Sequence, residues 1–210
     1  KIMKKLFYRK YNHINLTYIV NRLKVFIYET KNPNNPWLTK DSINILQSLL
    51  KQNDIGAEFG SGRSTLWFLK RVRHLVSVES DEGWFKTVSK NIEKHNLSYK
   101  IKYNLIQNKK KYPLILDEIQ DNSLDFCLID GIERDICALK CLPKIKTGGL
   151  IIVDNVNWFI PNNMTISPDS RRIENGCSSS VWEDFFNAVK LWRYIWTTNG
   201  VYDTCIWFKN

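Results

Sequence analysis

A glycine-rich turn between two acidic residues is the stretch of this sequence with the clearest chemical meaning. The turn reads E-F-G-S-G from Glu58 to Gly62, and Glu79 follows at the end of the next apolar run. Glycine permits positive φ and lets a ligand approach the backbone closely. The free N–H groups of a helix that begins after such a turn suit an anionic group. A carboxylate at the end of the next strand can accept hydrogen bonds from a ribose. The pattern therefore predicts a site for a nucleoside-type ligand.

Carboxyl side chains also follow two later apolar runs. The run L-D-F-C-L-I-D ends at Asp130, and the run L-I-I-V-D-N ends at Asp154 and Asn155. If both runs are parallel strands, their carboxyl ends meet at one edge of a sheet, where ligands of such folds bind. Glu133 follows Asp130 at the start of a helical pattern. Asp130, Glu133 and Asp154 are therefore the candidate general bases of such a site if it holds no metal ion.

The alternation of apolar runs and helical patterns predicts the elements that hold these residues. Strands are expected at residues 55–59, 75–79, 99–106, 124–130 and 150–154, with helices at 40–51, 64–73, 82–95 and 133–145. Thr147-Gly148-Gly149 is interpreted as the stop of the last of these helices. A helix at 181–191 and a hairpin around Asn199-Gly200 close the chain. This order predicts an α/β fold with a mostly parallel seven-stranded sheet, helices on both faces and a C-terminal antiparallel hairpin.

Residues 1–38 differ in character from residues 39–210, which hold the whole alternating pattern. Apolar side chains recur at helical spacing at Ile14, Tyr18, Ile19, Leu23, Phe26 and Ile27. The segment 1–38 is therefore predicted to be a helical cap or lid on a single main domain that spans residues 39–210. The basic and aromatic residues 2–11 leave contact with a membrane surface or a polyanion open as an alternative.

Composition narrows the class of protein. The 210 residues are 43% hydrophobic, enough for a buried core, and the net charge of +10 is spread along the chain. The charge permits an anionic partner, but its spread favours a solvated surface. Five cysteines without a C-x-x-C motif indicate reduced thiols and a cytoplasmic protein rather than a zinc site. No apolar stretch reaches 18 residues, so no transmembrane helix is expected.

The ordered motifs E-F-G-S-G, S-V-E, L-I-D-G and G-G-L-I-I-V-D-N resemble those of class I S-adenosylmethionine-dependent methyltransferases over about residues 39–155. Thr65 stands where a dinucleotide-binding motif has its third glycine, which favours the methyltransferase over a dehydrogenase. The resemblance implies a Rossmann-like methyltransferase fold with S-adenosyl-L-methionine as cofactor. The residues that it places at the cofactor are Glu58, Gly60, Ser61, Gly62, Ser64, Thr65, Glu79, Ser80 and Asp130.

A narrower resemblance concerns the acceptor side. Catechol- and caffeoyl-CoA-type O-methyltransferases hold a divalent cation with an aspartate after the fourth strand and an Asp-Asn pair after the fifth. Asp130, Asp154 and Asn155 match that pattern, which implies Mg²⁺ or another divalent cation with oxygen ligands. The lysine that this group has just after the first aspartate is missing here, where Gly131 follows. Without a metal, Asp154 and Asn155 would order the following loop through bonds to its backbone.

The long segment 156–180 leaves the expected acceptor side of the sheet. Trp158 is predicted to stack on a flat or sugar-like acceptor, and Arg171 and Arg172 to bind an acidic group; packing and solvation are the alternatives. We predict O-methylation of a small molecule or a glycan. A nucleic-acid or protein acceptor is an alternative that is not favoured, because no N/D-P-P-Y/F signature is present. A non-catalytic cofactor-binding scaffold is another, and the sequence does not indicate the oligomeric state.

Overall fold

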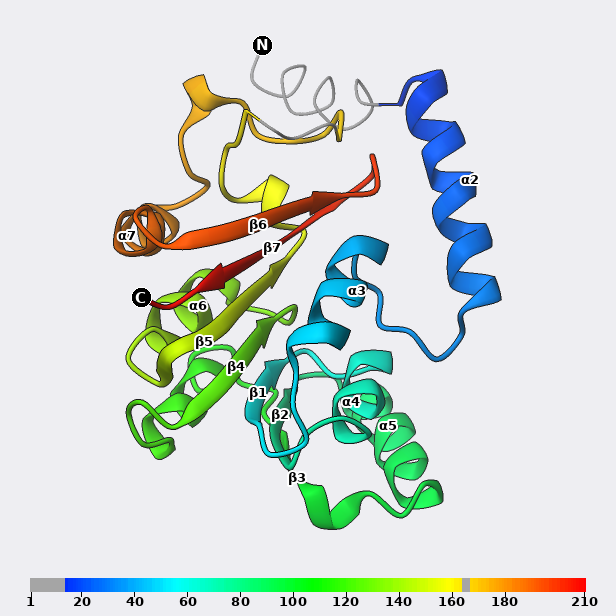
Figure 1. Ribbon diagram of the computed structural model, residues 1–210, viewed down its shortest axis with the longest axis vertical. Coiled ribbons are helices and arrows are strands. Elements are labelled where there is room, and N and C mark those ends of the chain that lie inside the picture. Colours follow the sequence, from blue (N-terminus) through cyan, green and yellow to red (C-terminus); the bar gives the residue numbers. More distant parts are fainter. Residues whose placement is uncertain (1–13, 164–166) are drawn as a thin grey trace.

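The computed structural model describes residues 14–163 and 167–210 (Figure 1). Its helices are α2 (Leu16–Lys31), α3 (Lys40–Leu49), α4 (Arg63–Leu69), α5 (Glu82–Lys94), α6 (Arg134–Cys141) and α7 (Ser180–Val189). Its strands are β1 (Ile55–Phe59), β2 (His74–Glu79), β3 (Ile101–Leu105), β4 (Leu124–Ile129), β5 (Ile145–Asp154), β6 (Arg193–Thr198) and β7 (Asp203–Phe208). Short 3₁₀ turns lie between them: η1 (Ser98–Lys100), η2 (Tyr112–Glu118), η3 (Val156–Trp158) and η4 (Ile173–Asn175).

One seven-stranded sheet organises the molecule, in the order β3-β2-β1-β4-β5-β7-β6. The strands from β3 to β5 pair in parallel, whereas β7 is antiparallel to both β5 and β6. The predicted seven-stranded α/β fold with a C-terminal antiparallel hairpin is therefore confirmed. The crossovers place the ends of β1, β2, β4 and β5 along one edge of the sheet, where such folds bind their ligands.

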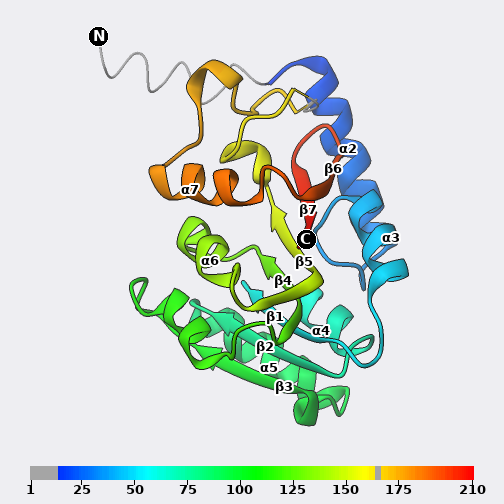
Figure 2. The same cartoon turned by 60° about the vertical axis from the view of Figure 1, so that its left-hand side comes forward.

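Helices cover both faces of the sheet because the central strands are apolar on both sides. Phe126 and Leu128 of β4 pack in a core with residues of α3, α4 and α5. Their neighbours Cys127 and Ile129 point the other way, into a core with residues of α6, α7 and η2. Figures 1 and 2 show these two groups of helices on opposite sides of the sheet.

The region between α6 and β5 corrects one sequence prediction. The predicted helix 133–145 ends at Cys141, and Pro143 follows directly after its C-cap, Leu142, because proline cannot continue a helix. Strand β5 already begins at Ile145, so the Gly148-Gly149 pair lies within a strand and does not stop a helix. Pairing jumps from Leu124–Ile145 to Phe126–Leu150, which leaves residues 146–149 as a bulge. Gly148 has φ +79° there, a conformation that glycine adopts without strain.

The helix expected near residues 14–28 is present as α2, but its predicted apolar face does not pack. Ile19, Leu23, Phe26 and Ile27 are all exposed. The buried residue of the helix is Val25, which packs with Val201 and Tyr202. Helical spacing predicted the helix correctly, but it did not show which side faces the domain.

The five cysteines are free thiols, and all except Cys177 are buried. Burial raises the pKa of Cys127 and Cys205, so these side chains pack as neutral groups within the sheet. Within residues 14–163 and 167–210, no helix has the length and apolar character needed to cross a membrane.

Candidate active site

Glu58 at the end of β1 lies buried beneath the glycine turn. Its Oε2 accepts hydrogen bonds from Thr65 Oγ1 at 2.7 Å and Ser77 Oγ at 2.9 Å. Its Oε1 is buried and has no hydrogen-bond partner among the described residues. Desolvation raises the pKa of this carboxyl to about 7, although the hydroxyl bonds oppose the shift. An unpartnered carboxyl oxygen at the base of the turn is the kind of group that a bound ligand satisfies.

The turn itself requires glycine because two strand ends meet there. Gly60 has φ +91°, and a Cβ at this position would lie 2.7 Å from the amide nitrogen of Gly131, beyond β4. The backbone N–H of Asp130 donates to Phe59 O at 2.8 Å. The glycine turn after β1 and the segment after β4 are therefore locked together, backbone against backbone.

Glu79 ends β2 and holds the other side of the turn. Its Oε2 accepts from the backbone N–H of Ser61 at 3.0 Å and from Ser61 Oγ at 2.8 Å. Its Oε1 accepts from the N–H groups of Ser80 at 2.7 Å and Asp81 at 2.9 Å. The Ser61 hydroxyl also lies 2.6 Å from the hydroxyl of Tyr103. The carboxylate is thus fixed by backbone donors, and its bond to a hydroxyl is the one that a ligand hydroxyl can replace.

Two tryptophans border this turn, and the sequence did not place either of them there. Trp84 Nε1 donates to Ser61 O at 2.6 Å, and its ring stacks on Trp37 with centroids 6.2 Å apart. The guanidinium of Arg63 lies 4.9 Å from the centre of the Trp37 ring. Trp84 is 37% exposed, so it does not pack in the core beneath α5. Its position in the first turn of α5 sends it over the glycine turn instead.

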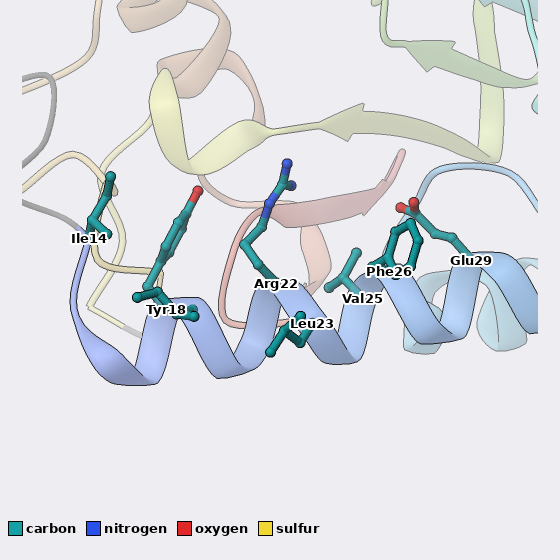
Figure 3. Close-up of a pocket in the computed structure, with 8 residues that line it drawn as sticks. Ile14, Tyr18, Arg22, Leu23, Val25, Phe26 and Glu29 are labelled. Atoms are coloured by element: carbon teal, nitrogen blue, oxygen red, sulfur yellow. The ribbon is translucent and has the colours of Figure 1, made fainter.

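A pocket of about 370 Å³ lies beside the ends of β4 and β5. Its lining residues are Tyr18, Arg22, Glu29, Trp37, Asp130, Asp154, Asn155, Trp158, Val201 and Tyr202. Three of them, Tyr18, Arg22 and Glu29, come from α2, and Figure 3 shows them pointing from this helix toward the rest of the domain. We call this the acceptor pocket. Asp130, Asp154, Asn155 and Trp158 line it together, as expected from strands that end at one edge, whereas sequence did not single out Trp37 or Tyr202.

Arg134 in the first turn of α6 ties the ends of β4 and β5 together. Its Nε donates to Gly131 O at 2.8 Å, and its Nη2 to Asp130 O at 2.8 Å. Its Nη1 donates to Asp154 O at 2.8 Å and Asn155 Oδ1 at 3.1 Å. An ion pair joins Nη2 to Asp130 Oδ1 at 2.9 Å. These five contacts match the five N–H donors of a guanidinium, so each N–H of this side chain has an acceptor within the protein.

The two carboxyls of the acceptor pocket have different environments. Desolvation raises the pKa of Asp130 to about 6, although the ion pair with Arg134 opposes the shift. Desolvation and the nearby charge of Asp130 raise the pKa of Asp154 well above its usual range. Asp154 is buried, and its Oδ1 accepts from Thr204 Oγ1 at 2.6 Å. Asp130 is thus the carboxyl of the pair that ionises more easily.

The remaining predicted site residues do not line the acceptor pocket. Glu133 has φ +49° and serves as the N-cap of α6, and it does not line the acceptor pocket. Arg171 donates to the carbonyls of Gly176, Asn175 and Cys177, so it orders its own loop. Arg172 is exposed, 3.8 Å from Glu174. Ser64 is buried in the first turn of α4, where its hydroxyl acts on Glu58 and opposes the rise of the pKa of that carboxyl.

The chain has the fold of solved methyltransferase structures, as the resemblance of its sequence motifs predicted. A candidate caffeoyl-CoA O-methyltransferase from Staphylococcus aureus matches with a TM-score of 0.58 at 17% identity, over 100% of both chains. A candidate rRNA methylase from Clostridium thermocellum matches at 0.56 and 13%, over 81% of this chain and 94% of its own. Precorrin 8W decarboxylase from Methanobacterium thermoautotrophicum matches at 0.55 and 16%, over 84% and 92%. No protein-family model and no curated protein sequence matches the chain.

Proposed function

We propose that the chain is an S-adenosylmethionine-dependent methyltransferase that methylates an oxygen of a small molecule or a glycan. The observation that supports this most is that the glycine turn, where the cofactor would bind, directly adjoins the acceptor pocket. We call the glycine turn with Glu58 and Glu79 the donor half of the site. Gly60 of the glycine turn approaches Gly131 so closely that neither tolerates a side chain, and Asp130, next to Gly131, lines the acceptor pocket. A donor held in the turn would thus lie next to an acceptor held at Asp130. This adjacency is what alignment of the reacting groups requires.

The residues of the donor half fit the proposed cofactor. When bound, S-adenosylmethionine supplies a methyl group activated by a positively charged sulfur. The turn follows Glu58 directly, and the buried Oε1 of this carboxyl has no partner among the described residues, so a polar group of the cofactor could satisfy it. Glu79 would accept the ribose hydroxyls in place of the Ser61 hydroxyl, which already marks the position of such a donor.

On the acceptor side, the protein supplies a base and aromatic walls. Asp130 would take the proton of the acceptor hydroxyl, because its carboxyl is held at the pocket by Arg134 and has a pKa near 6. Trp37, Trp158 and Tyr202 provide flat surfaces suited to an aromatic ring or a sugar. The decisive experiment incubates the protein with S-adenosylmethionine and a panel of phenols, catechols and glycans, and measures S-adenosylhomocysteine.

The divalent cation implied by resemblance to the metal-dependent O-methyltransferases does not fit this arrangement. Of the three expected ligands, Asp130 and Asn155 accept from Arg134, and Asp154 Oδ1 accepts from Thr204. The guanidinium is thus a built-in cation among these oxygens, and we infer that it takes over the organising role of a metal ion.

Chelation tests this inference. We expect turnover to be unchanged within about twofold in excess EDTA, because Arg134 already supplies the positive charge near the acceptor oxygen. Calorimetric titration with Mg²⁺ or Mn²⁺ should likewise give no heat of specific binding. Loss of turnover in EDTA that Mg²⁺ restores would show that a metal displaces the arginine.

Replacing Glu79 by alanine tests the donor half without any acceptor. We expect Glu79→Ala to weaken S-adenosylmethionine binding at least about tenfold, because a charge-assisted hydrogen bond contributes roughly 1.5–3 kcal/mol. Calorimetry on the purified variant gives this number, with Glu82→Ala on the exposed start of α5 as the control. Equal affinities for both variants would remove Glu79 from the cofactor site.

A nucleic-acid acceptor is the alternative that one observation favours, namely the net charge of +10. Binding to RNA through phosphate contacts would weaken steeply with salt. Salt-dependent RNA binding together with methyl transfer to RNA, and no transfer to small acceptors, would replace our proposal. Cofactor binding without turnover on either class of acceptor would instead favour a non-catalytic scaffold.

A further inference from the structure

Helix α2 carries an apolar stripe that faces away from the domain. The stripe consists of Leu16, Ile19, Val20, Leu23, Phe26 and Ile27. Each of these side chains is 40–78% exposed. Their spacing of three and four residues puts them on one side of the helix. Figure 3 shows Leu23 pointing away from the domain, opposite to Tyr18 and Arg22, whereas Phe26 lies at the border of the stripe, beside Glu29. We call these six residues the outer stripe.

The orientation of α2 is set by its other side. Val25 is buried in a small cluster with Val201 and Tyr202, and Tyr18 packs against the same cluster. Glu29 accepts from the hydroxyl of Tyr202 at 3.4 Å, and its carbonyl accepts from Arg63. These contacts attach α2 to the domain through Tyr18, Val25 and Glu29. In the described part of the chain, no element covers the outer stripe.

Positive charges border the outer stripe. Lys24 and Lys31 lie along one side of it, and both are exposed. The single acid of α2, Glu29, faces the domain rather than the stripe. Residues 1–13, which lie outside the described structure, add five Lys or Arg side chains to the sequence just before the helix. An apolar face bordered by cations, without acids, is typical of helices that lie in a membrane interface.

We propose that α2 docks this protein on the surface of a lipid bilayer rich in anionic headgroups. The apolar side chains of the outer stripe would enter the boundary between headgroups and acyl chains, and the flanking cations would contact the headgroups. The charges favour this occupant over a second copy of the chain. Pairing two outer stripes would bring the lysines of both copies together, and like charges in proximity weaken association.

Helix α2 contributes to the acceptor pocket as well as to the outer stripe. Tyr18, Arg22 and Glu29 of the same helix line that pocket, so one element contributes both to the membrane face and to the pocket wall. Methylation is not needed for docking, and the two properties can be measured separately.

Vesicle sedimentation tests the proposal on the full chain. We expect binding to phosphatidylcholine vesicles with about one third phosphatidylserine, and at least about tenfold weaker binding to pure phosphatidylcholine. The double variant Leu23→Asp/Phe26→Asp should lose binding at least about tenfold because it places two charges in the apolar interface. Lys24→Glu/Lys31→Glu should lose it to a similar extent, and high salt should abolish the remaining difference between the two vesicle types.

Leu191→Asp is the matched control, because Leu191 is 84% exposed and lies beyond α7, on a different element. Retention of binding in this variant and loss in the stripe variants supports the proposal, with circular dichroism and S-adenosylmethionine affinity as checks on folding. Absence of sedimentation with anionic vesicles overturns it. A dimer in solution that Leu23→Asp dissociates, without vesicle binding, assigns the outer stripe to a second copy instead.

Discussion

Replacing Asp130 by asparagine is expected to lower kcat by about 10²–10⁴-fold while leaving S-adenosylmethionine affinity within about threefold. Asparagine keeps the size of the side chain and an oxygen that can accept from Arg134, so the contact at 2.9 Å can persist. It cannot take a proton from an acceptor hydroxyl. The affinity for the cofactor should change little, because in our proposal the cofactor is bound by Glu58, Glu79 and the backbone of the glycine turn.

The measurement is the rate of S-adenosylhomocysteine formation at saturating cofactor, on whichever acceptor the panel identifies. Asp121→Asn is the control, since Asp121 is an exposed partner of Lys144 and precedes β4, at the opposite end of this strand from Asp130. If Asp130→Asn keeps kcat within about threefold of the wild type, Asp130 is not the base. Asp154, the other carboxyl of the acceptor pocket, would then be the next candidate.

The fold was largely predictable because its central strands are buried on both faces. Strands β1, β2 and β4 read as short apolar runs that end in an acid or a glycine, and such runs are characteristic of parallel sheets. The start of β5 was missed for a physical reason. Residues 146–149 bulge out of the pairing with β4, and a Gly-Gly pair in a bulge has the same local sequence as a helix stop.

The candidate site was predictable where its residues are close in sequence to a strand end. Glu58, Glu79, Asp130 and Asp154 all follow this rule, since parallel strands bring their ends to one edge. Arg134 could not be found in this way. Its role depends on carbonyl oxygens from the ends of both β4 and β5, and those oxygens come together only in the folded chain. For α2, the helical period gave the element, but the contact with Val201 and Tyr202 decides which side is buried.

In the absence of cofactor, we expect the free energy of unfolding of Glu58→Gln, relative to that of the wild type, to be higher at high pH than at low pH. The folded state holds this carboxyl with a pKa of about 7, against a usual value of 4.5. Between these two values the folded state binds the proton and the unfolded state does not, so the free energy of unfolding of the wild type falls as pH rises. The stability that Glu58 contributes is complete below its unfolded pKa and is lost as pH passes through 7.

Glutamine does not titrate. As the pH rises, the free energy of unfolding of Glu58→Gln should therefore increase relative to that of the wild type. The shift of about 2.5 pH units corresponds to roughly 3 kcal/mol, of which about 2–3 kcal/mol falls between pH 5 and pH 8. Urea unfolding followed by tryptophan fluorescence at both pH values measures it. The other buried carboxyls titrate in both proteins, and Glu93→Gln on the exposed side of α5 controls for removal of a carboxyl. A difference that stays constant between the two pH values would mean that Glu58 is ionised throughout, and that its unpartnered oxygen is satisfied by water within the turn.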